Sequence, residues 1–184
     1  MNEQDKYKEI TLQTTPIYSG KIISLQVDQV QLPNGKTASR EIVRHPGAVA
    51  VLAIYDSKMI VVEQFRKAVE ASMIEIPAGK LEPGEDLAEA AKRELEEETG
   101  YTCSRIYPIA SFVTSPGFAD EILHLFAAEN LQPGRANPDE DEFLDVSLIT
   151  LDEALQYIAE GKIRDAKTMM AVYAWRLYQL TGKM

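Results

Sequence analysis

The sequence has almost no cysteine, no long apolar run and a deficit of basic residues, and each shortage excludes a class of protein. Its single cysteine, Cys103, has no second cysteine with which to form an internal disulfide or a cysteine metal site, which is typical of a reducing compartment. No apolar segment is long enough to cross a bilayer, and residues 1–10 lack the basic-then-apolar pattern of a signal peptide. We therefore expect a cytoplasmic protein without a membrane partner.

The charge balance excludes a nucleic-acid backbone as a general partner. The 29 acidic and 19 basic residues give a formal net charge of -10, which repels polyanions. A small phosphorylated ligand remains compatible, because divalent cations held by clustered carboxylates can reverse the local field. With 184 residues, of which 45% are hydrophobic, the chain suits one globular domain carrying a small extra element.

Strand and helix patterns are mixed along the chain and predict an α/β fold around one sheet. Residues 23–45 read as a β-hairpin joined by a Pro33-Asn34-Gly35 turn, because Asn34-Gly35 tolerates the positive φ that a tight hairpin requires; it lies within a less regular N-terminal portion of about 45 residues. Residues 47–66 hold two apolar strands about Asp56-Ser57-Lys58, and their continuous apolar character predicts the centre of the sheet. Further strands are predicted at 73–76, 104–113, 122–128 and 143–149, and helices at 86–99, 150–158 and 166–180. Gly100 is the expected stop of the first helix, and Thr150 and Glu153 form a capping-box pattern at the start of the second.

The segment RELEEETG, residues 93–100, places an unusual density of acid at the end of the first predicted helix. Apolar residues at steps of four predict its buried stripe, whereas Glu94, Glu97 and Glu98 share another face. Like charges at these spacings repel by roughly 0.2 to 0.5 kcal/mol per pair, and they also face the negative end of the helix dipole. Arg93 can reach Glu97 but cannot neutralise the whole group.

Two explanations of this acidic face remain open on charge alone. Most charge runs are solvated surfaces, and this run fits that description. The other explanation is a hard divalent cation, since Mg²⁺ favours carboxylate oxygens and bridges to substrate phosphates. The preceding glycine-rich loop favours a cation, because Gly79 and Gly84 allow backbone to approach a ligand. Glu85 adds an acid there, or serves structurally by pairing with Arg93.

Residues 79–101, GKLEPGEDLAEAAKRELEEETGY, resemble the Nudix box at every position except Tyr101, where an aliphatic residue is usual. The resemblance implies a Nudix fold, an α/β/α sandwich on a mixed β-sheet, and hydrolysis of a nucleoside diphosphate linked to another group. It also implies that Mg²⁺, with Mn²⁺ as a possible substitute, is held by Glu94, Glu97, Glu98 and the carbonyl of Ala78, while Arg93 orients the glutamates.

Flanking residues resemble the ADP-ribose pyrophosphatase subfamily of Nudix hydrolases. Arg66, in VEQFR, matches a substrate-contacting arginine, and SPGF places Pro116 and Gly117 at a characteristic distance beyond the box. Residues 1–45 resemble the extension that builds a homodimer and contacts substrate there, which leaves 46–184 as the hydrolase domain. Alternatively, Arg66 forms a surface ion pair, Pro116 is an ordinary turn residue and the hairpin covers a sheet edge.

The resemblance implies hydrolysis of ADP-ribose to AMP and ribose 5-phosphate. The alternatives are another nucleoside diphosphate sugar, such as GDP-mannose, and a non-catalytic binding module. Arg66, with Arg44 or Arg40, is expected to hold phosphate or ribose oxygens. The acidic loop offers Glu140 and Glu142 as the general base; the resemblance favours Glu142, whereas a solvated acidic loop is the plain alternative.

Overall fold

The computed structural model describes residues 6–137 and 142–182, and the chain divides into two compact units. The N-terminal unit comprises Met1–Gly47 together with Val113–Ile122, and the larger unit comprises Ala48–Phe112 together with Leu123–Met184. Each unit has its own sheet, and each is described by itself. Within the described residues, no helix has both the length and the apolarity to cross a membrane.

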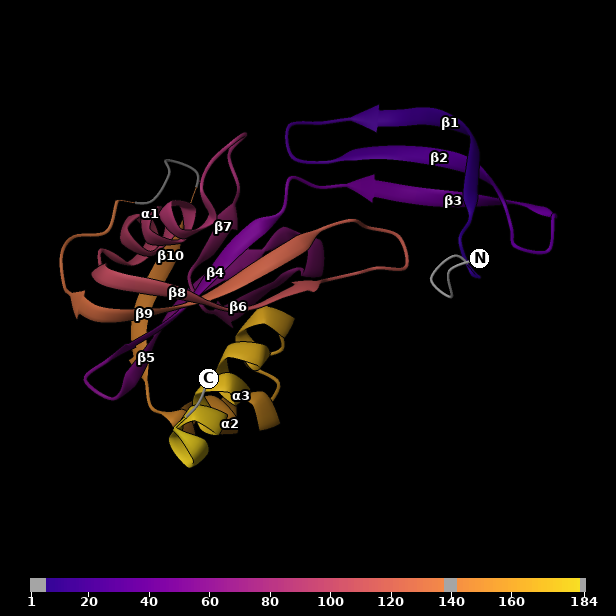
Figure 1. The fold of residues 1–184 in the computed structure, drawn as a ribbon. Coiled ribbons are helices and arrows are strands. Elements are labelled where there is room, and N and C mark those ends of the chain that lie inside the picture. The colour runs from indigo at the N-terminus through magenta and orange to yellow at the C-terminus, as the bar shows by residue number, and fades with distance from the viewer. Residues whose placement is uncertain (1–5, 138–141, 183–184) are drawn as a thin grey trace. The chain divides into compact units, whose positions relative to one another are not determined.

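The N-terminal unit is a three-stranded antiparallel sheet of β1 (Ile10–Ser19), β2 (Ser24–Gln31) and β3 (Thr37–Arg44), in that order (Figure 1). Strands β2 and β3 form the predicted hairpin, and β1 adds a third strand where the sequence indicated a less regular segment. Strand β1 contains Pro16, which cannot donate to a ladder and is tolerated on an edge strand, and its pairing is irregular on both sides of the strand centre.

The connection between β2 and β3 is the predicted turn at Pro33, Asn34 and Gly35. Only Gly35 has a positive φ, of 81°, and the loop closes through a hydrogen bond from Leu32 N to Lys36 O at 2.8 Å. The side chain of Asn34 instead accepts from Lys36 N at 3.0 Å. A two-residue turn of the larger unit lies at Asp56 and Ser57, where φ is 49° and 60°.

The larger unit contains a seven-stranded sheet with the path β10-β5-β4-β9-β8, in which β6 pairs with β5 and β7 with β4. Its central strand β4 (Ala48–Tyr55) runs parallel to β9 and antiparallel to β5 and β7, so the sheet is mixed. The other strands are β5 (Lys58–Arg66), β6 (Ala71–Glu75), β7 (Ala78–Lys80), β8 (Thr102–Val113), β9 (Ile122–Gln132) and β10 (Leu144–Ile149).

Strand β4 is buried on both faces, which confirms the prediction made from its apolar run. Its odd residues, such as Val49 and Val51, pack in a cluster with α1 (Leu87–Thr99). Its even residues, such as Ala50 and Leu52, pack with α2 (Leu151–Ala159) and α3 (Ala166–Thr181). The alternation of side chains along a strand thus divides the core into two layers, with α1 on one face of the sheet and α2 and α3 on the other (Figure 1).

Local capping sets the ends of the helices. Asp86 caps α1 by accepting from the backbone of Ala88 and Glu89, and Gly100 ends it with a φ of 76°. The capping box predicted at Thr150 and Glu153 is present at the start of α2. A short 3₁₀ turn at Lys67–Val69 separates β5 from β6.

Candidate active site

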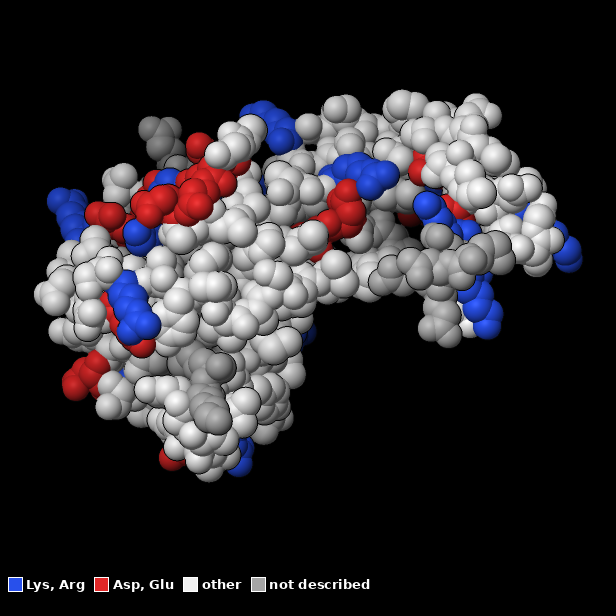
Figure 2. Space-filling view, viewed as in Figure 1, with Lys and Arg blue, Asp and Glu red and all other residues white. Residues whose placement is uncertain are grey.

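Two of the three clustered glutamates on α1 are buried. Glu94 is 9% exposed and Glu98 only 2%, whereas the Glu97 side chain is 41% exposed. Figure 2 shows Asp and Glu side chains gathered over α1. A solvated acidic surface therefore does not describe Glu94 and Glu98, because burying an ionised carboxylate costs free energy unless something compensates its charge.

Arg93 is the hub that joins the glutamates to the loop before the helix. Its Nε and Nη2 donate to the two carboxylate oxygens of Glu85 at 2.8 and 3.0 Å. Its Nη1 donates to Glu94 Oε1 at 2.8 Å and to Glu97 Oε2 at 3.0 Å. The structure thus confirms that Arg93 reaches Glu97, and it assigns to Glu85 the structural pairing with Arg93. One guanidinium orients three carboxylates, and it offsets only part of their charge.

The backbone of β7 lies directly against the buried carboxylates. Ala78 N donates to Glu98 Oε2 at 3.1 Å. A Cβ atom at Gly79 would stand 2.0 Å from the Glu94 carboxyl carbon, so only glycine leaves room for that side chain. Gly79 thus has a packing role that the sequence did not reveal, because it admits the carboxylate of Glu94; the expectation that it also lets a ligand approach the backbone stays a prediction.

Burial raises the pKa of both buried glutamates. For Glu98 the pKa rises to about 8, first because its carboxylate is desolvated and further because of the charges of Glu94 and Glu142. For Glu94, burial also raises the pKa, and the hydrogen bond from Arg93 opposes this rise. At neutral pH, Glu98 would ionise fully only if a nearby cation offset its burial.

Glu142 lies close enough to the cluster for its charge to raise the pKa of both Glu94 and Glu98. It is half-buried, in the segment just before β10. Glu140, the other predicted base, lies outside the described residues. The structure therefore brings one acid of the loop toward the carboxylates of α1, and the choice of base stays a prediction.

Arg66 at the end of β5 makes a two-pronged ion pair with Glu75, at 2.8 Å for each hydrogen bond. This pair is not a surface ion pair of the kind considered from the sequence, because Glu75 is only 3% exposed and also bonds Lys167 at the start of α3. Sequence reasoning missed Glu75 and Lys167. The available signal was an acid within the apolar stretch SMIEIP, residues 72–77, which required a buried partner.

The two arginines predicted to contact substrate from the N-terminal unit each form an ion pair with an acidic side chain. Arg40 donates through Nε to Glu9 Oε2 at 2.9 Å, and Arg44 donates through Nη1 to Asp120 Oδ2 at 2.9 Å. Both arginine side chains remain more than 40% exposed, so each can bind a further anion.

Pro116 and Gly117 occupy a turn in which Phe118 N and Ala119 N donate to Ser115 O at 3.1 and 2.9 Å. This turn lines a hollow of about 360 Å³ together with Arg40, whereas Arg44 does not line it. The N-terminal unit thus brings together three of the four predicted residues.

The carboxylates of α1 fit a hard divalent cation by their chemistry. Arg93 engages one oxygen each of Glu94 and Glu97, which leaves the second oxygen of each for a cation. Buried Glu98 needs a positive charge that Arg93 does not supply. Across residues 6–137 and 142–182, no three His, Cys, Asp or Glu side chains are already gathered around one point, so coordination requires side-chain adjustment.

Comparison with known proteins agrees with these observations. Residues 44–172 match the NUDIX domain family, and residues 9–43 match the nucleoside diphosphate sugar hydrolase N-terminal domain family. The chain is 56% identical over 176 residues to the methanol dehydrogenase activator of Bacillus methanolicus, covering 94% of this chain and 95% of the relative. It is 53% identical over 168 residues to the ADP-ribose pyrophosphatase of Bacillus subtilis strain 168, covering 90% and 91%.

A solved structure described as an ADP compounds hydrolase superposes with a TM-score of 0.84 at 20% identity, covering 96% of this chain and 97% of that one. At this identity the match concerns the fold, and it confirms the predicted sandwich of helices about a mixed sheet.

Proposed function

The chain belongs to the Nudix family, and from that premise we propose that it hydrolyses the diphosphate bond of ADP-ribose to AMP and ribose 5-phosphate in a reaction that requires Mg²⁺. The observation that carries the proposal is the pair of buried carboxylates, Glu94 and Glu98, on the helix that holds Arg93. Similarity to an ADP-ribose pyrophosphatase along 90% of the chain supports the substrate.

Glu94, Glu97, Glu98 and the carbonyl of Ala78 are the proposed metal ligands. Bound Mg²⁺ would neutralise the diphosphate and lower the pKa of coordinated water. Arg93 keeps the carboxylates in place by holding one oxygen of Glu94 and one of Glu97. Mn²⁺ is the expected substitute, because it shares the preference for oxygen ligands.

Arg66 is proposed to hold an oxygen of the diphosphate. Glu75 engages its Nε and Nη2 and so fixes the plane of the guanidinium, while Nη1 is left for a ligand. The side chain is 40% exposed and therefore accessible to substrate. Planar, two-pronged pairing makes arginine better suited than lysine to such a role.

Glu142 is proposed as the general base that takes the proton of the attacking water. Its support is its electrostatic effect on Glu94 and Glu98, which requires that it lie near them. Glu142→Gln is expected to lower kcat by roughly 10² to 10⁴, with a smaller change in KM. Glu140→Gln is the matched control with a small loss, and the reverse order of losses would exchange the two roles.

Chromatographic detection of AMP from ADP-ribose tests the activity directly. We expect release with Mg²⁺, none with EDTA, and recovery when excess Mg²⁺ is restored. A panel including GDP-mannose tests the alternative substrate class; a higher kcat/KM for GDP-mannose would replace ADP-ribose as the substrate. Activity that is indifferent to EDTA would contradict the metal-dependent reaction.

The N-terminal unit is proposed to form a homodimer and to contact substrate through Arg40, Arg44, Pro116 and Gly117. Strand β1 supports the dimer, because Ile10, Leu12 and Ile17 are each more than half exposed, an apolar surface that a second copy would cover. Leu12→Asp is expected to give monomers in sedimentation, with Gln13→Glu as the control. An active wild-type monomer would remove the dimer from the proposal.

The protein is proposed to act in the cytoplasm, with its single Cys103 as the supporting observation.

A second candidate function is activation of a methanol dehydrogenase, favoured by 56% identity to such an activator. Adding the protein to a methanol dehydrogenase assay tests it, and an unchanged dehydrogenase rate would dismiss it.

A further inference from the structure

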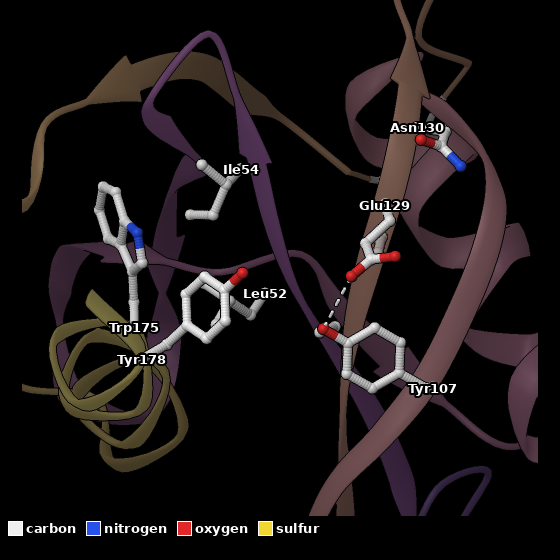
Figure 3. A pocket seen from close by; sticks show the side chains of 9 residues that line it. Leu52, Ile54, Tyr107, Glu129, Asn130, Trp175 and Tyr178 are labelled. Atoms are coloured by element: carbon white, nitrogen blue, oxygen red, sulfur yellow. Dashed lines mark hydrogen bonds between the residues drawn. The ribbon is translucent and has the colours of Figure 1, made fainter. Parts of the chain in front are cut away.

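The larger unit contains a second hollow, of about 280 Å³, on the face of the sheet opposite α1. Helix α3 contributes Trp175 and Tyr178, β4 contributes Leu52 and Ile54, β8 contributes Tyr107, and β9 contributes residues 127–130 (Figure 3). None of these residues belongs to the carboxylate cluster or to the proposed substrate contacts. The hollow is therefore separate from the candidate active site.

Trp175 has a buried ring and an unpaired donor at this hollow. The residue is only 3% exposed, yet no group in the described chain accepts a hydrogen bond from its indole nitrogen. The described residues also contain no fully buried side-chain nitrogen or oxygen that lacks a partner, so the nitrogen must reach open space. Figure 3 shows it on the side of the ring that faces Ile54 and Tyr178. A buried indole N–H usually finds an acceptor.

The opposite wall offers an acceptor. Glu129 Oε1 accepts from the Tyr107 hydroxyl at 3.1 Å, and Glu129 Oε2 accepts from Arg105 Nη1 at 3.0 Å. An ionised carboxylate has about four acceptor positions, so both oxygens can accept again. The hydroxyl of Tyr178 also points into the space between α3 and the strands (Figure 3).

The shape and charge of the hollow restrict the ligand. Pockets for drug-sized molecules measure about 300–1,000 Å³, so this smaller space suits one or two fused rings. Aromatic rings from α3 and β8 favour a flat ligand that stacks. Glu129 is the one charged lining residue in the described chain, and no lysine or arginine lines the hollow, which disfavours a phosphorylated ligand.

We propose that this hollow binds a free purine base that carries an exocyclic amino group, as adenine does. A ring nitrogen of the base accepts from Trp175 Nε1 or from the Tyr178 hydroxyl, and the amino group donates to Glu129. The site goes beyond the proposed function and does not depend on it. The protein would then have a second binding site, which takes an uncharged purine base rather than the charged diphosphate substrate.

The chain provides its own reporter, because Trp175 is its only tryptophan. Adenine is titrated into the full-length protein, and indole fluorescence is excited at the red edge of its band, where purines absorb little. We expect a saturable change, with a matching Kd from calorimetry. Unsubstituted purine, which lacks the amino group, is expected to bind more weakly. Absence of saturable binding of adenine at millimolar concentration by both methods would overturn the proposal.

Three variants test the contacts. Glu129→Gln, Tyr178→Phe and Trp175→Phe each remove one polar contact and keep most of the volume, so each is expected to weaken adenine binding by roughly 3- to 10-fold. Adenine binding to Trp175→Phe is measured by calorimetry, because this variant lacks the fluorescent reporter. If Trp175→Phe does not fold, Glu129→Gln and Tyr178→Phe, which change more exposed residues, still test the contacts. Tyr173→Phe is the control, since Tyr173 is half exposed on the same helix and does not line the hollow.

A variant of the carboxylate cluster separates this site from the candidate active site. Glu98→Gln is expected to bind adenine with wild-type affinity whether or not the protein hydrolyses ADP-ribose. Loss of adenine binding in Glu98→Gln, or wild-type affinity in all three hollow variants, would locate the base elsewhere and refute the assignment.

Discussion

Replacing Glu98 by glutamine tests whether this buried carboxylate is kept for a cation. Glu98 is 2% exposed, and burial raises its pKa from 4.5 to about 8. A carboxyl group with a raised pKa in the folded state contributes stability that is complete below its unfolded pKa. That stability is lost as the pH rises through the folded pKa. The metal-free protein should therefore lose stability between pH 4.5 and pH 8 on account of this group.

The magnitude at pH 7 follows from proton uptake on folding. Each pH unit above 4.5 costs about 1.4 kcal/mol, so the free energy of unfolding is lowered by roughly 3 kcal/mol at pH 7. Glutamine is neutral, and its amide oxygen can still accept from Ala78 N. Glu98→Gln is accordingly expected to raise the free energy of unfolding in EDTA by about 2 to 3 kcal/mol while ADP-ribose hydrolysis is nearly lost.

Urea unfolding of both proteins, in EDTA and in Mg²⁺, measures the effect without relying on activity. Mg²⁺ should stabilise the wild type more than the variant, because the variant has lost a charged ligand. Glu96→Gln, at an exposed position of the same helix, should stay within about 0.5 kcal/mol of wild type. A Glu98→Gln protein that is less stable than wild type in EDTA, or that gains as much from Mg²⁺, would refute the reasoning.

Three further substitutions test other parts of the site. Gly79→Ala puts a methyl group 2.0 Å from the Glu94 carboxyl carbon, so it should reduce kcat by at least about 10-fold through displacement of Glu94; unchanged kinetics would contradict the packing. Burial tends to raise the pKa of Glu75, but Arg66 and Lys167 outweigh it and the pKa is lowered below 4.5. The ionised Glu75 carboxylate therefore stabilises the fold above pH 4.5, and this stabilisation is lost at lower pH. The difference in unfolding free energy between wild type and Glu75→Gln, measured in urea, should shrink below pH 4.5. A difference that does not change with pH would exclude the ion pair as its cause. Leu95→Ala should cost about 2 to 5 kcal/mol of unfolding free energy, measured by urea unfolding, and a smaller loss would mean that the core layer beside α1 collapses to fill the space.

Features that depend on neighbours in the chain were determined by the sequence alone. The apolar runs on either side of Asp56-Ser57 predicted the central strands, because a strand buried on both faces carries no polar alternation. The sequence also predicted the capping box at Thr150 and the helix end at Gly100, because each depends only on residues within one turn of a helix. The spacing of Glu94, Glu97 and Glu98 likewise predicted that they share a face of α1, away from its buried stripe.

Burial and long-range pairing were decided only by the tertiary structure. The sequence could not tell a solvated acidic face from a buried one; that depended on β7 lying against α1, with Gly79 leaving space for Glu94. Glu75 and Lys167 are 92 positions apart, and no local pattern joins residues at such a distance. The hollow at Trp175 draws on a helix and three strands that are remote in sequence. Local interactions act through covalent connection and regular periodicity, whereas these contacts exist only once the two faces of the sheet have been covered.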